Sequence, residues 1–175
     1  MAPTSPSNSL SFPQAIEETK SLMDQIAANK LSEAEIEQKV SSILSSKTGG
    51  RGFFVAYLTS DSSLADDPSV GVISGLKSAI KISSELLVKN LAMSSAMALI
   101  HHQNGDLDNI AGSKRVSQRT SNLIQRIDFP SINTKLEKLN DTIQNGAGEY
   151  QEFLERWGYN EEQKEAIQAS ISGLL

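Results

Sequence analysis

The sequence predicts an all-α protein, a single-domain bundle of about six to eight helices around a central apolar helix at residues 85–103. Apolar residues recur at spacings of three and four through almost the whole chain, which is the pattern of amphipathic helices. Short Gly, Pro and Ser clusters interrupt this pattern, and 175 residues is the size of one domain. We therefore expect residues 11–175 to form one helical domain behind a disordered, Ser- and Pro-rich tail at residues 1–10.

The first two helices are predicted by their N-terminal signals. Ser11 comes two positions before a proline, and proline is favoured in the first turn of a helix. Ser32 and Glu35 have the spacing of a capping box, in which each side chain bonds to the other residue's backbone N–H. We expect the second helix to end at the glycine pair Gly49–Gly50.

The segment 51–58 is open to two interpretations. Its run from Phe53 to Leu58 is continuously apolar, rich in aromatic residues and typical of a buried strand. The sequence contains no second strand candidate, however, and a lone strand would leave its backbone donors unpaired. We therefore expect a short buried helix, with a strand as the alternative.

A polar loop at residues 59–69 and a glycine-interrupted helical pattern precede the strongest predicted helix. Ser83 or Ser84 is the expected N-cap of the helix at residues 85–103. This helix is apolar on nearly all sides, which is typical of a helix that others surround. Asn104 and Gly105 form the expected C-terminal stop.

Several further helices are predicted in the rest of the chain. Asp106 or Asp108 begins the next helix, and Pro130 separates it from the one that follows. Asn160 and Gln163 resemble another capping box, ahead of the last apolar stripe.

The composition excludes several classes of function. The chain contains no cysteine, which excludes disulfides, thiol catalysis and thiolate metal sites. Its net charge of −5 argues against a general nucleic-acid binder, although the basic residues between Lys81 and Arg126 leave a nucleic-acid contact as a weaker hypothesis. No apolar stretch is long enough to span a bilayer, and residues 1–9 do not resemble a secretory signal. We therefore expect a soluble, cytoplasmic protein that does not bind membranes.

No catalytic or metal-binding constellation is evident. His101 and His102 are the only histidines, and adjacent side chains on a helix diverge by about 100°, so the two rings do not converge on one metal. Asp106 and Asp108 could complete a weak site, but we expect the histidines to cap the last carbonyls of their helix. No serine lies in a Gly-x-Ser-x-Gly elbow. We expect no metal and no cofactor, and favour a protein that is not an enzyme.

The main candidate site is a basic helix face. Arg115, Arg119 and Arg126 lie at positions i, i+4 and i+11, so they share one side of their helix with Asn122. Such a face offers planar sets of donors to a phosphate, a carboxylate or an acidic partner, although an ordinary solvated face is the alternative. The complete candidate set for an anion or a partner is Arg51, Lys114, Arg115, Arg119 and Arg126.

The C-terminal third, residues 128–175, is acidic and contains most of the aromatic residues. It carries nine acidic residues and four basic ones. Tyr150, Phe153, Trp157 and Tyr159 lie close together in it. Such a stripe belongs either to the core or to a partner surface rimmed by glutamates.

The leading hypothesis is a non-enzymatic helical module for protein interaction or regulation. The basic face and the acidic C-terminal third could meet within one chain or between chains, so the partner is another protein or a second copy. The alternative is a protein, possibly an enzyme, that binds a small ligand or anion through Arg51, Arg115 and Arg119.

Overall fold

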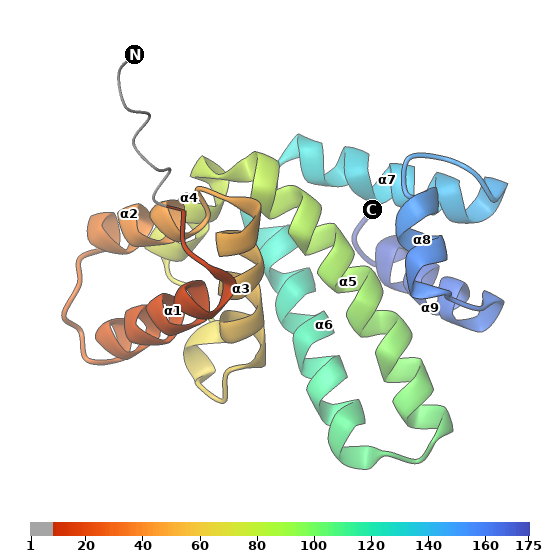
Figure 1. Ribbon diagram of the computed structural model, residues 1–175, viewed down its shortest axis with the longest axis horizontal. Helices are drawn as coiled ribbons and strands as arrows, with labels where there is room; N and C mark the ends of the chain where they lie inside the picture. The colour runs from red at the N-terminus through yellow and green to blue at the C-terminus, as the bar shows by residue number, and fades with distance from the viewer. Residues whose placement is uncertain (1–8) are drawn as a thin grey trace.

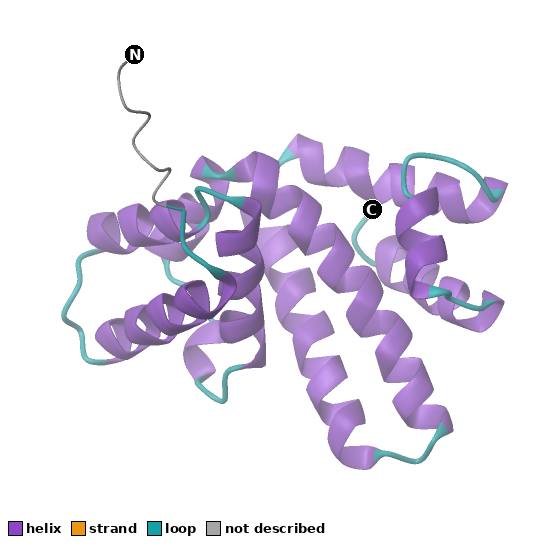
Figure 2. Ribbon diagram, viewed as in Figure 1, coloured by secondary structure: helices purple, strands orange, loops and turns teal. Residues whose placement is uncertain are grey.

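The computed structural model describes residues 9–175, and this part of the chain is built from nine α-helices and one 3-10 turn, with no strand (Figure 2). The helices are α1 (Phe12–Ala27), α2 (Glu33–Ile43), α3 (Lys47–Thr59), α4 (Val70–Ser78), α5 (Ile80–Gln103), α6 (Leu107–Ile127), α7 (Pro130–Asn145), α8 (Gln151–Trp157) and α9 (Glu161–Ser172). The predicted all-α bundle is confirmed. None of these helices is both long enough and apolar enough to cross a membrane.

Local signals fix the starts of three helices as the sequence predicts. Reciprocal capping boxes join Ser11 to Gln14 at α1 and Ser32 to Glu35 at α2. Asn160 closes a third box at the start of α9. Each box satisfies backbone donors that have no partner inside the helix.

The helices form three groups (Figure 1). In the first group α1 packs on α3, and α2 packs on α4. The long helices α5 and α6 form an antiparallel hairpin at the centre of the molecule, and α7, α8 and α9 lie beyond α5 (Figure 1). Helix α5 contacts five other helices, which confirms its predicted central place.

The sequence predicts that the glycine pair before the segment 51–58 ends α2, and this prediction is wrong. The segment is helical, but its helix α3 begins at Lys47, and Gly49 and Gly50 lie inside it. Ser46 caps α3 by accepting a hydrogen bond of 3.0 Å from the Gly49 N–H. A Cβ at Gly50 would stand 2.8 Å from side-chain atoms of both Ile82 and Leu86. The glycine therefore permits close helix packing, and this contact outweighs its low helix propensity.

The start of α5 also differs from the prediction. The helix begins at Ile80, so Ser83 and Ser84 lie within it and are buried. The Ser83 hydroxyl donates to the carbonyl oxygens of Leu76 and Ala79, at 2.8 and 3.0 Å. The Ser83 hydroxyl therefore stabilises the turn between α4 and α5 and does not cap α5.

Two further expectations concern the ends of the chain. Residues 1–8 of the expected tail lie outside the described residues, and Leu10 packs against the core.

In the aromatic C-terminal stripe Tyr150 and Tyr159 are buried and Phe153 packs against the core. Trp157 is 52% exposed. The stripe is thus mainly core, and its tryptophan lies at the surface.

Candidate functional site

The basic face of α6 has the geometry that its spacing predicts, and Arg119 is its buried centre. The Arg119 side chain is 4% exposed. Its Nε and Nη2 atoms donate to the two carboxylate oxygens of Asp66, at 2.7 and 3.2 Å. Its Nη1 atom donates to the carbonyls of Leu58 and Ser60, at 3.0 and 2.6 Å, and Nη2 also donates to the carbonyl of Ser62 at 3.2 Å. Five bonds use the five donors of a guanidinium, so none remains for a ligand.

The neighbouring polar residues of α6 bind the same loop. The Nη2 atom of Arg126 donates to Asp67 at 2.7 Å, and its Nη1 atom to the carbonyl of Pro68 at 3.3 Å. The Asn122 amide donates to the backbone carbonyl of Asp66 at 3.1 Å. The basic face therefore forms its ion pairs with the loop at residues 60–69, and not with the acidic C-terminal third.

The electrostatics of the loop agree with this arrangement. The hydrogen bond from Arg119 lowers the pKa of Asp66 below its ordinary value, because it stabilises the carboxylate. Burial raises the pKa of Tyr57, whose hydroxyl donates to the carbonyl of Leu64 at 3.3 Å. The loop is thus held from α6 and from α3.

The other predicted site residues do not join Arg119. The Arg51 guanidinium lies over the Phe12 ring, 5.7 Å from its centre, on the α1–α3 side of the molecule. Lys114 is exposed. The partners of the basic face were not predicted, although Asp61, Asp66 and Asp67 lie close together in the sequence.

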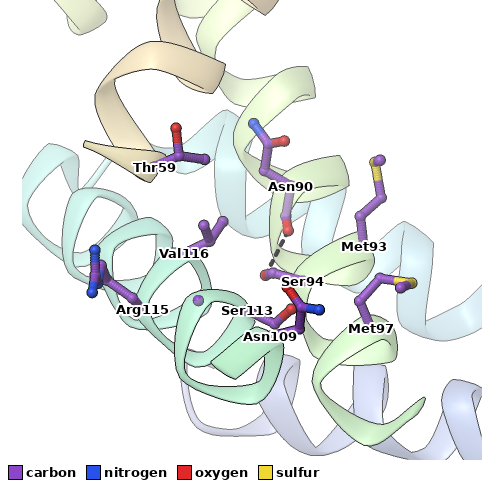
Figure 3. Close-up of a pocket in the computed structure, with 10 residues that line it drawn as sticks. Thr59, Asn90, Met93, Ser94, Met97, Asn109, Ser113, Arg115 and Val116 are labelled. Carbon is purple, nitrogen blue, oxygen red and sulfur yellow. Dashed lines mark hydrogen bonds between the residues drawn. The ribbon is translucent and has the colours of Figure 1, made fainter. Parts of the chain in front are cut away.

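Arg115 differs from Arg119 and Arg126 because its side chain lines a cavity. The cavity has a volume of about 350 Å³ and lies between α5, α6 and the end of α3 (Figure 3). Helix α3 contributes Thr59. Helix α5 contributes Asn90, Met93, Ser94 and Met97, and α6 contributes Asn109, Gly112, Ser113, Arg115 and Val116. We call this cavity the α5–α6 groove.

The α5–α6 groove combines an apolar wall with a polar rim. Met93, Met97 and Val116 supply the apolar surface, and Met97 is 40% exposed. A Cβ at Gly112 would meet no atom within 4 Å, so this position is open space. On both helices the lining residues recur at spacings of three, four and seven, which places them in two rows along the hairpin.

The Arg115 guanidinium retains donors that can bind a further acceptor. Within residues 9–175 it makes one hydrogen bond, from Nη1 to the Asp61 carboxylate at 2.9 Å. The Arg115 side chain is 43% exposed and that of Asp61 is fully exposed, at 100%. An ion pair in this position is screened by water and contributes little to stability.

A second polar cluster joins α5 to the C-terminal helices. The half-buried Glu85 carboxylate accepts hydrogen bonds from Lys89 at 2.8 Å, from Lys135 at 3.1 Å and from the Tyr150 hydroxyl at 3.2 Å. Burial raises the Glu85 pKa, but the bonds from the two lysines outweigh it and hold the pKa below its ordinary value. The cluster connects three helical segments, which is a structural role.

The histidines have the environment of a helix end. His101 and His102 lie in the last turn of α5, and the Nδ1 atom of His101 is 3.7 Å from the Asp106 carboxylate. The part of the chain that the structure describes contains no group of three His, Asp or Glu residues that could hold a metal.

Comparison with known proteins places this fold in a family. Residues 11–174 match the family described as Uncharacterised conserved protein UCP020893. The chain belongs to this family. The match extends from the N-cap of α1 past the end of α9, so the matched residues include Arg119, the loop at residues 60–69 and the α5–α6 groove. No curated protein and no solved structure matches the chain.

Proposed function

We propose that this member of the UCP020893 family is a non-enzymatic helical module that binds another protein, and that the α5–α6 groove is its binding surface. The observation that carries the proposal is the groove itself: an open trough with Met93, Met97 and Val116 in its wall and Arg115 at its rim. An exposed apolar trough with a polar rim is typical of a protein-binding surface.

The state of the four candidate arginines favours a protein partner over a free anion. A phosphate site needs several converging hydrogen-bond donors. The donors of Arg119 already bind the loop at residues 60–69, and Arg126 is paired with Asp67. Arg51 lies against Phe12. Arg115 alone combines unused donors with a place on the groove, which suits one carboxylate beside an apolar contact.

The shape of the groove suits an amphipathic segment. The two rows of lining residues match the spacing at which a helix presents side chains at i, i+3, i+4 and i+7. Methionine side chains are flexible and polarizable, so they adapt to different apolar partners. A regulatory role in the cytoplasm is part of the proposal.

A small apolar ligand is the second candidate, and the cavity volume supports it. Pockets for small molecules have volumes of about 300–1,000 Å³, and the groove of about 350 Å³ lies at the lower end of this range. Such a ligand would place its apolar part against the methionines and an acidic group on Arg115.

Selection from a random peptide library tests the proposal. The bait is the full chain, and the blocked variant is Gly112→Phe, which fills the open space in the groove. The matched control is Gln118→Phe, because Gln118 is exposed on the same helix and does not line the groove. We expect peptides with apolar residues at helical spacing that bind the wild type and Gln118→Phe at least about tenfold more tightly than Gly112→Phe.

Two results would contradict the proposal. One is a selection that yields no binding peptide. The other is a set of peptides that bind Gly112→Phe as tightly as the wild type. A thermal-shift screen with small apolar carboxylates covers the second candidate, because a ligand of the groove raises the Tm of the wild type and not of Gly112→Phe.

A further inference from the structure

We infer that the α5–α6 groove of one molecule receives Trp157 from a second copy of the chain. This inference rests on the proposed function, because it names the partner of the same groove. It is carried by three kinds of complementarity between the groove and the C-terminal end of α8: in apolar chemistry, in hydrogen bonding and in charge.

Trp157 is the most exposed aromatic side chain of the described residues. It is the only tryptophan in the sequence and is 52% exposed, whereas Tyr150 and Tyr159 of the same stripe are buried. The residue stands at the end of α8, immediately before Gly158, whose left-handed φ of 62° ends the helix. A tryptophan buries about 150–250 Å² when it is covered, and it is among the residues that contribute most to protein interfaces.

The groove offers an indole ring suitable neighbours. Met93 and Met97 lie one helical turn apart on α5, and thioethers make favourable contacts with aromatic rings. The amide oxygens of Asn90 and Asn109, at the rim, can accept the indole N–H. The ring's apolar body and its single donor therefore both find partners.

The segment around Trp157 is acidic, and a basic residue, Arg115, stands at the rim of the groove. Residues 149–162, which include Trp157, carry five acidic residues and one basic residue. Glu155 is exposed two positions before Trp157. At the groove Arg115 has unused donors, and the adjacent Lys114 is exposed. A glutamate of the second copy can replace Asp61 on Arg115 at little cost, because the Asp61–Arg115 pair is exposed to water.

Each chain carries both surfaces, which determines the form of the assembly. Trp157 does not line the groove of its own chain. Two chains that exchange their tryptophans form a closed two-fold dimer, whereas one-way insertion forms a ring or an open chain. Mass in solution distinguishes these forms, and the same groove contact is tested in each.

The single tryptophan makes the contact directly measurable. We would record Trp157 emission and iodide quenching of the full chain over a wide range of protein concentration, with sedimentation velocity in parallel. The expected result is a blue-shifted emission with weaker quenching at high concentration, together with an increase in mass. Both changes should reverse on dilution and weaken with added salt, because the contact includes opposite charges.

Variants assign the contact to the groove. Gly112→Phe is expected to keep the emission of an exposed tryptophan at every concentration, and Gln118→Phe is expected to associate like the wild type. The charge reversal Arg115→Glu should weaken association at least about tenfold, and adding Glu155→Arg to it should restore association. Circular dichroism and Tm show that each variant is folded.

Three outcomes would overturn the inference: no concentration dependence of mass and emission in the wild type, undiminished association of Gly112→Phe, or association that leaves Trp157 emission unchanged. The peptide selection separates this failure from failure of the proposed function. If peptides still bind in a manner that depends on Gly112, the groove binds another protein. If the selection also fails, the proposed function fails with it.

Discussion

Replacing Arg119 by alanine is expected to lower the free energy of unfolding by about 3–5 kcal/mol. The buried guanidinium donates to three backbone carbonyls and one carboxylate, and the substitution leaves these acceptors without it. The bond to the Leu58 carbonyl is fully buried, so an unsatisfied oxygen there costs about 1–3 kcal/mol. The carbonyls of Ser60 and Ser62 are partly buried and each adds a smaller amount. Asp66 adds little, because water reaches its carboxylate.

Urea denaturation followed by circular dichroism measures this change, and an unaltered m-value shows that the extent of unfolding is the same. For a chain of this size each kcal/mol corresponds to about 2–4 °C, so the Tm should fall by roughly 10 °C. Arg119→Lys should fall between the wild type and Arg119→Ala, since lysine keeps the charge but not the planar set of donors.

Arg126→Ala and Arg115→Ala are the matched controls. Both side chains pair with an exposed aspartate and are 43% exposed, so each substitution should cost no more than about 1 kcal/mol. If Arg119→Ala costs as little as Arg126→Ala, then Arg119 does not hold the loop, and its assignment as a structural residue is wrong.

Three further predictions concern other sites. Gly112→Ala should raise the free energy of unfolding by about 0.5–1 kcal/mol, because the new Cβ enters open space. Gly52→Ala should lower the free energy of unfolding by about 1–3 kcal/mol, because its new Cβ would stand 2.5 Å from a Cβ of α1. Urea denaturation measures both changes. Folding lowers the pKa of Asp66, so the Asp66 carboxylate contributes to stability above its unfolded-state pKa, and this contribution is lost as the pH falls through its folded-state pKa. In Asp66→Asn, the fall in Tm below about pH 4 should therefore be less steep than in the wild type. Glu85→Gln should lower the free energy of unfolding by about 1–2 kcal/mol at neutral pH, since two partly buried lysines lose their carboxylate partner. Thermal unfolding at neutral and at acid pH should show a smaller loss of stability at acid pH.

The parts of the fold that depend on neighbouring residues could be predicted from the sequence. A capping box such as Ser32 with Glu35 is complete within four positions, so its pattern is visible without the tertiary structure. The shared face of Arg115, Arg119 and Arg126 follows from helical periodicity in the same way. Asn104 and Gly105 ended α5 as expected, with Gly105 at a left-handed φ of 67°.

The features that the sequence analysis missed depend on residues distant in the chain. Gly50 resembles a helix stop until Ile82 and Leu86 are seen to occupy the space of its missing side chain. Arg119 resembles a ligand-binding residue until the end of α3 and the following loop, 53 to 61 positions earlier, are seen to pack against it. The α5–α6 groove has no local pattern of its own, because its lining comes from three helices.

The backbone that Arg119 binds and the groove are connected through Thr59. The carbonyls that Arg119 binds include those of Leu58 and Ser60, on either side of Thr59, and Thr59 lines the groove. The buried arginine therefore holds the backbone on both sides of one residue that lines the proposed binding surface. Burial separates two arginines on the basic face of α6. All the donors of Arg119 are used within the fold, whereas Arg115 has donors to spare and, on the proposed function, exchanges Asp61 for a carboxylate of a partner.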